Sequence, residues 1–134
     1  MIGLVVASHG HLAQELLATA EQIVGPLSQT TACSVEPGAS PEEIKKGLRE
    51  SIEKVDSGEG VLVFADLIGG TPCTQSLSLC RARSLEVLTG VNLPMLLKAN
   101  ALRAKTPVLK ELAHGLTEYG KKSIMCATDA LRVA

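Results

Sequence analysis

The sequence predicts an α/β fold in which a doubly wound, mainly parallel sheet carries helices on both faces. Short apolar runs alternate along the 134 residues with longer amphipathic stretches, which is the order of a strand–helix–strand chain. Residues 2–7 and 61–65 are apolar at almost every position, as expected of strands buried on both faces. We therefore expect about four parallel strands within a single domain over residues 1–134.

The first strand delivers His9 to its carboxyl end, and a helix begins at once beyond it. Within residues 12–24, apolar side chains recur at helical spacing, which predicts a helix with one buried face. Gly25 and Pro26 end this helix. In an open parallel sheet, ligands and reactive groups collect at the carboxyl ends of the strands, so His9 is a candidate functional residue.

The second strand is predicted at residues 30–35, a short run rich in β-branched side chains. A second helix is predicted over residues 41–55. Ser40 has a hydroxyl that caps its first turn, and Glu42 and Glu43 lie near the positive end of the helix dipole.

The third strand, at residues 61–65, ends at Asp66. A glycine-rich turn leads from there into a helix over about residues 72–83. The remaining elements are predicted as a strand at residues 85–89, a helix from about residue 94, a helix over residues 106–120 and a short final strand at residues 123–128.

Charge and composition exclude several classes of partner. The chain has 13 basic and 14 acidic residues, so it lacks the basic footprint that binds nucleic acid or an anionic membrane. With Phe64 and Tyr119 as the only aromatic residues, base stacking is also disfavoured. We expect a cytoplasmic protein with reduced cysteines, because the sequence shows no membrane span, signal peptide or C-x-x-C motif.

Three of the predicted strands are followed by polar or glycine-rich residues that packing of the hydrophobic core does not explain. His9 follows the first strand, Asp66 the third and Asn92 the fourth. The first and third strands of a doubly wound sheet commonly lie side by side where the winding reverses, so His9 and Asp66 are expected to face each other. A carboxylate bonded to one imidazole nitrogen fixes the tautomer and leaves the other nitrogen free as a nucleophile.

Glycines and helix starts beside these side chains favour an anion. Gly10 and Gly70 allow the backbone to approach a ligand closely, and the helices that follow direct free N–H groups at the crevice. Thr71 adds a hydroxyl donor. Together with His9, these features predict a phosphohistidine site.

Other interpretations stay open on pattern alone. A histidine at a strand end is often structural, Asp66 is a common turn residue, and the crevice also suits a regulatory or anion-binding module. His9, His11, Asp66 and Cys73 form a further candidate set as metal ligands, although alternate side chains at a strand–helix junction diverge. We expect neither a metal nor a cofactor, and we expect His11 and His114 to be bystanders.

Three segments around these residues resemble a known family. The runs are Gly-Leu-Val-Val-Ala-Ser-His-Gly-His, Phe-Ala-Asp-Leu-Ile-Gly-Gly-Thr-Pro and Thr-Gly-Val-Asn-Leu-Pro-Met-Leu. In order and spacing they are similar to the mannose-class EIIA domain of the bacterial phosphoenolpyruvate-dependent sugar phosphotransferase system. The resemblance covers essentially the whole chain and implies a phosphotransferase component.

The resemblance implies a role for each residue of the site. His9 would accept a phosphoryl group from phospho-HPr and pass it to a histidine of an EIIB partner. Asp66 would orient His9 through Nδ1, and the Thr71 hydroxyl would help to hold the phosphoryl oxygens. Ile68 and His11 stand where some relatives carry tryptophan, which changes the docking rim more than the chemistry.

The resemblance also implies an assembly. Family members are homodimers that exchange a carboxyl-terminal strand, and residues 123–128 would play that part here. Since residues 1–134 include no EIIB-like segment, we expect EIIB to be a separate polypeptide. Contact with a membrane is expected only through EIIC and EIID components, if the protein serves transport. A sensor of phosphorylation state, without transport, is the alternative role.

Overall fold

The computed structural model describes residues 1–67, 70–80 and 84–131, and within them four parallel strands form one sheet. The sheet order is β2-β1-β3-β4, so the chain winds outward in both directions from the central pair β1 and β3. The predicted fold class and the adjacency of the first and third strands are confirmed. The strands are β1 (Gly3–His9), β2 (Thr30–Val35), β3 (Val61–Ala65) and β4 (Leu85–Leu88).

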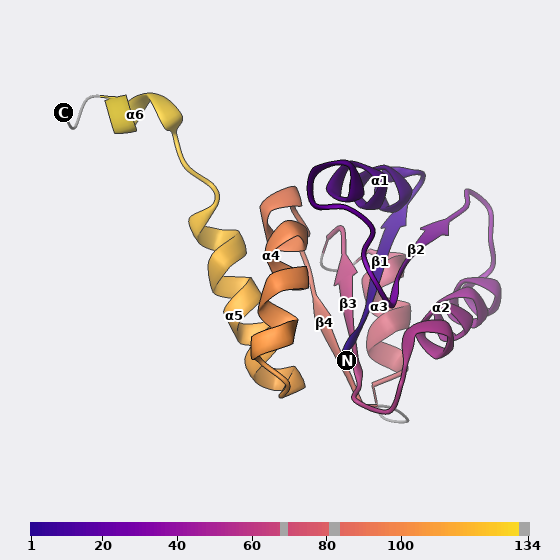
Figure 1. The fold of residues 1–134 in the computed structure, drawn as a ribbon. Coiled ribbons are helices and arrows are strands. Elements are labelled where there is room, and N and C mark those ends of the chain that lie inside the picture. Colours follow the sequence, from indigo (N-terminus) through magenta and orange to yellow (C-terminus); the bar gives the residue numbers. More distant parts are fainter. Residues whose placement is uncertain (68–69, 81–83, 132–134) are drawn as a thin grey trace.

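Helices cover both faces of this sheet, as Figure 1 shows. One face carries α1 (Leu12–Val24), α4 (Leu93–Lys105) and α5 (Leu109–Lys122), and the other carries α2 (Pro41–Val55) and α3 (Thr71–Ser78). Alternate residues of β1 serve the two cores: Leu4 packs on the α1 side and Val5 on the α2 side. None of the helices in the described ranges is long and apolar enough to cross a bilayer.

Side-chain caps set the starts of two helices. The Ser40 hydroxyl accepts the Glu43 N–H at 3.2 Å, so the predicted capping residue of α2 is confirmed. Asn92 does the same for α4, where its Oδ1 accepts the Met95 N–H at 2.9 Å. Its Nδ2 also donates to the Gly120 carbonyl at 3.2 Å, which ties α4 to α5.

Several element boundaries differ from the prediction. Strand β4 ends at Leu88 rather than at residue 89, and α5 covers Leu109–Lys122 rather than residues 106–120. Strand β1 continues beyond residue 7 and includes His9 as its last residue. Helix α3 ends at Ser78, although the pattern predicted a helix to about residue 83, of which residues 81–83 lie outside the described part. The helix ends early because the Leu79 and Cys80 N–H groups bond three residues back, which tightens the last turn.

Within the single chain, the predicted strand at residues 123–128 does not form, and its exchange with a second copy stays a prediction. Residues 124–126 have no regular structure, and Ala127–Leu131 forms a short helix, α6. A strand exists only through its ladder of hydrogen bonds to a neighbour, and this segment leads away from the sheet (Figure 1). Ile124 and Met125 are 78% and 69% exposed.

Buried Arg103 joins α4 to the loops before β1 and β2. Its guanidinium donates to the Ile2 carbonyl at 3.0 Å, to the Ser28 carbonyl at 2.5 Å and to the Asn100 side-chain oxygen at 3.2 Å. The side chain is only 4% exposed, and burial lowers its pKa. Because these acceptors are uncharged, the hydrogen bonds must offset the desolvation of the cation.

Replacing Arg103 with alanine is expected to lower the free energy of unfolding by about 3 kcal/mol. The change removes the guanidinium donor from the buried Ile2 carbonyl and opens a cavity, while the Ser28 carbonyl keeps only its bond from the Thr30 hydroxyl at 2.9 Å. Urea denaturation of the two proteins measures the difference. Arg49→Ala, which removes an exposed guanidinium from α2, is the matched control; equal losses in the two variants would show that the buried hydrogen bonds contribute nothing.

Candidate active site

His9 and Asp66 meet at the carboxyl ends of the two central strands, β1 and β3. One carboxylate oxygen, Asp66 Oδ2, accepts the His9 backbone N–H at 3.0 Å and lies 2.7 Å from the ring Nδ1. An ionised carboxylate only accepts hydrogen bonds, so Nδ1 is the donor. The neutral imidazole then carries its free lone pair on Nε2.

His9 is much more exposed than Asp66, as expected of a nucleophile and the carboxylate that orients it. The side chain of His9 is 48% exposed, whereas that of Asp66 is 9% exposed. Burial alone raises the pKa of Asp66, but hydrogen bonds from the His9 backbone and ring, and from the Leu67 N–H, outweigh it and hold the pKa below its ordinary value. The carboxylate therefore stays ionised while the imidazole faces outward.

A buried hydroxyl that the sequence interpretation missed fixes the turn after His9. The Ser8 Oγ accepts the Ala13 N–H at 2.7 Å and donates to the His9 carbonyl at 3.0 Å. Helix α1 has no side-chain cap from His11, so Ser8 satisfies one of its free N–H groups from within the strand. The available signal was a serine placed a few residues before the first amphipathic turn.

Gly70 leaves room for the imidazole of His9. A Cβ at position 70 would lie 2.8 Å from His9 Cε1 and 3.2 Å from Leu67 Cδ1. On the other side of the histidine, Gly10 has a φ of +56°, a left-handed conformation that suits glycine. Both predicted glycines therefore border His9: Gly70 lies against its ring, and Gly10 is the next residue in the chain.

Gly70→Ala is expected to reduce the rate of any reaction at His9 about tenfold. The new methyl group pushes the imidazole out of line, and a misplacement of this kind is costly where alignment matters. Burst kinetics with a phosphoryl donor measures the effect. Gly47→Ala, on α2 with open space around it and no left-handed φ, is the control for a glycine replaced elsewhere in the fold. An unchanged rate in Gly70→Ala would mean that the close approach of residue 70 to the His9 ring does not affect the reaction.

Thr71 is the first residue of α3 and directly follows the glycine that touches His9. Gly70 is the N-cap, with φ −79° and ψ 160°, and it offers no side-chain cap. Among the described residues no side chain caps the first turn, so its N–H groups are available to a ligand, except at Pro72, which has none. Gly69 and Ile68, which the sequence pattern placed in this loop, lie outside the described residues.

The loop after β4 borders the same edge of the sheet. The Val91 N–H donates to the Ala65 carbonyl at 3.1 Å, which holds this loop against the end of β3. Asn92, the polar residue that the sequence places after the fourth strand, has a structural role here, because it caps α4 rather than facing His9.

A metal centre finds no support in the described part of the chain. Within residues 1–67, 70–80 and 84–131, no three His, Cys, Asp or Glu side chains gather closely enough to hold an ion. His11 is exposed at the start of α1, and Cys73 is buried in α3. His114 is exposed on α5, away from the strand ends.

Comparison with known proteins identifies the family. The family model EIIA-man, described as the PTS system fructose IIA component, matches residues 3–116. The chain belongs to this family. This EIIA chain is 30% identical over 124 residues to the mannose-specific EIIAB component of the phosphotransferase system of Escherichia coli K12. The match covers 92% of the chain but 38% of that protein, so the chain spans less than half the length of this relative.

Solved structures of EIIA proteins share the fold. The mannose/sorbose-specific IIA subunit of the phosphotransferase system of Enterococcus faecalis superimposes with a TM-score of 0.85 at 29% identity, over 93% of each chain. The EIIA component of Streptococcus agalactiae has a TM-score of 0.89 at 24% identity, over 96% of this chain and 99% of that one. The sheet and helices of this EIIA chain therefore have the arrangement of phosphotransferase system IIA proteins.

Apolar side chains flank the histidine of this EIIA chain at the surface. Leu12 is 49% exposed in the first turn of α1, and Leu67 is 50% exposed next to Asp66. Exposed apolar residues beside a reactive group are typical of a surface that a protein partner covers. The sequence pattern had assigned Leu12 to the buried side of the helix.

Proposed function

We propose that this EIIA chain is a histidine phosphocarrier of a sugar phosphotransferase system, with His9 as the residue that carries the phosphoryl group. The observation that carries the proposal is the 2.7 Å contact between His9 Nδ1 and Asp66 Oδ2. It leaves Nε2 unprotonated on a half-exposed ring. Family membership supplies the class of reaction.

The transfer follows from these groups. In the proposed step, the Nε2 lone pair of His9 attacks the phosphorus of a phosphohistidine on phospho-HPr. The new N–P bond forms as the old one breaks, and the electron pair of the broken bond stays on the departing HPr nitrogen. Such a transfer depends mainly on alignment and on stabilising the charge of the phosphoryl oxygens.

The protein groups around His9 meet these two demands. Asp66 keeps the ring oriented and stabilises it if a positive charge develops on it. The free N–H groups at the start of α3, the Thr71 hydroxyl and the backbone at Gly10 and Gly70 surround the position of the phosphoryl oxygens in this proposal. In the second step a histidine of an EIIB partner attacks the same phosphorus, and His9 leaves with its Nδ1 proton in place.

Phosphorylation in a reconstituted system tests the proposal. The protein is incubated with phosphoenolpyruvate, enzyme I and HPr, and its intact mass is measured before and after acid treatment. The expected result is one acid-labile phosphoryl group, absent when HPr is omitted. If no adduct forms with cognate enzyme I and HPr, the site serves instead as an anion-binding or regulatory module.

We further propose that the chain acts as a homodimer through its carboxyl-terminal segment, residues 123–131. In this segment Ile124, Met125 and Leu131 are 78%, 69% and 80% exposed, and α6 buries none of its residues. Exposed apolar side chains of this kind favour burial against another surface. Sedimentation velocity is expected to show a dimer that dissociates when Ile124 and Met125 are both replaced by serine. A monomeric wild-type protein would contradict this assembly.

A further inference from the structure

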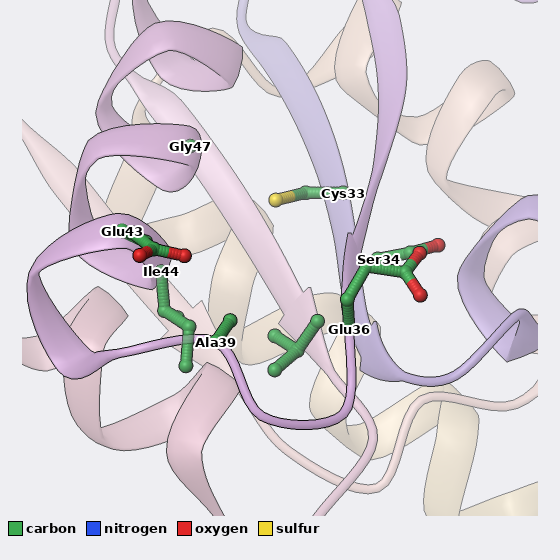
Figure 2. Close-up of a pocket in the computed structure, with 8 residues that line it drawn as sticks. Cys33, Ser34, Glu36, Ala39, Glu43, Ile44 and Gly47 are labelled. Atoms are coloured by element: carbon green, nitrogen blue, oxygen red, sulfur yellow. The ribbon is translucent and has the colours of Figure 1, made fainter.

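A cavity of about 210 Å³ lies between the edge strand β2 and helix α2, and neither His9 nor Asp66 lines it (Figure 2). Apolar groups form most of its walls. The Cys33 side chain points across it from β2 toward α2, where Gly47 leaves open space. Val35, Ala39 and Ile44 line the rest. The cavity therefore accepts an aliphatic group.

The charged groups at this cavity are all acidic. Glu43 lines it from α2, and Glu36 lines it where β2 ends. Both residues are exposed, and no basic residue lines the cavity among the residues that the structure describes. In Figure 2 the side chains of Ser34 and Glu36 lie on the opposite side of β2 from that of Cys33. Carboxylates therefore flank the strand on both of its faces, which favours a cationic occupant.

The outer edge of β2 is open to pairing. In the described sheet, β2 pairs with β1 alone, and each of its residues is partly exposed. Thr30–Val35 contains no charged residue and no proline, although natural edge strands usually carry such residues to prevent pairing with other chains. The free N–H and C=O groups along this edge therefore offer a template for an added strand.

We propose that the β2 edge and this cavity together bind an extended, basic segment of a partner protein, with a lysine side chain in the cavity. An added strand directs alternate side chains to the face that holds Cys33 and Val35. The methylene groups of a lysine pack on the apolar walls, and its ammonium group reaches the carboxylate of Glu43. The next residue of the strand faces Glu36 on the other side, so a second basic residue also fits.

The proposed partner segment lies next to the histidine but does not require it. The Val35 carbonyl accepts the Gly10 N–H at 3.2 Å, so the end of β2 adjoins the turn that follows His9. A partner held on β2 is thereby placed beside the reactive edge of the sheet. Binding is nevertheless expected to be the same in His9→Gln, which separates this proposal from the phosphocarrier function.

Peptide titration followed by nuclear magnetic resonance tests the proposal. The probe is acetyl-Thr-Val-Lys-Val-Thr-amide, compared with analogues in which norleucine or glutamate replaces the lysine. The lysine peptide is expected to shift the amide resonances of residues 30–36 and 43–47, and to protect Cys33 but not exposed Cys126 from alkylation. The norleucine peptide is expected to bind about threefold more weakly, because it lacks the ion pair with exposed Glu43.

Two variants locate the binding. Gly47→Leu fills the cavity with a better helix former and is expected to abolish the shifts without harming the fold. Glu43→Gln is expected to weaken binding of the lysine peptide about threefold, because the ion pair at this exposed position is screened by solvent. Its matched control, Glu42→Gln, removes the same charge one residue earlier and should bind normally.

Three results would overturn the proposal. They are equal affinity for all three peptides, undiminished binding to Gly47→Leu, and binding of n-butylamine as tight as that of the lysine peptide. The last result would assign the cavity to a free amine and not to a partner strand.

Discussion

Replacing His9 with glutamine is expected to abolish the acid-labile phosphoryl adduct completely. The glutamine amide has a hydrogen-bonding side chain of similar reach but no nucleophilic nitrogen, so no N–P bond forms. Because the His9 side chain is half exposed, the free energy of unfolding should change by less than about 1 kcal/mol. Intact mass spectrometry after incubation with phosphoenolpyruvate, enzyme I and HPr measures the adduct.

His11→Gln is the matched control for this experiment. His11 is exposed two residues further along, and its side chain makes no cap for α1. This variant should be phosphorylated like the wild-type protein. An adduct that survives in His9→Gln and disappears in His11→Gln would move the nucleophile from the end of β1 to the start of α1 and contradict the proposed site.

Asp66→Ala is expected to slow phosphoryl uptake about 100-fold, the size of effect that a misplaced reacting group produces. The alanine leaves both the backbone N–H and the Nδ1–H of His9 without their acceptor. The ring is then free to rotate and to adopt the other tautomer, in which Nε2 carries the proton. Rapid-quench measurements with phospho-HPr give the rate constant.

Two further variants separate orientation from folding. Asp66→Asn keeps one acceptor oxygen and should recover part of the rate, because a neutral amide still bonds Nδ1–H but stabilises positive charge on the ring less. Asp56→Ala, which removes a carboxylate from the end of α2, should leave the rate unchanged. If Asp66→Ala reacts at the wild-type rate while remaining folded, Asp66 has no part in the mechanism.

The sheet and its active edge were largely predictable from residue pattern. Continuous apolar runs identified β1 and β3 as doubly buried strands, and a doubly wound order then placed them side by side. The contact between His9 and Asp66 follows from that adjacency alone. The expectation that residues at the carboxyl ends of neighbouring parallel strands lie close together was therefore enough to predict a contact between residues 57 positions apart.

The features that the sequence pattern did not reveal depend on contacts between residues that are not neighbours in the sequence, or on local geometry that only the structure shows. Ser8 reads as one more residue at a strand end, yet its burial and its bond to Ala13 are visible only in three dimensions. Residues 123–128 have the composition of a strand, but strand formation requires a neighbour, and the chain supplies none there. The end of α3 depends on weak bonds in its last turn rather than on any strong stop signal.

A single oxygen of Asp66 holds His9 by both its main chain and its ring. If the phosphoryl group resides on Nε2, neither of these bonds changes when it arrives or departs. The residue then passes between its loaded and empty forms with little reorganisation, as expected of a preorganised site. Under the proposed function, this geometry adds little reorganisation to the barrier for transfer in either direction. The same two hydrogen bonds would then serve both the loading and the unloading of His9.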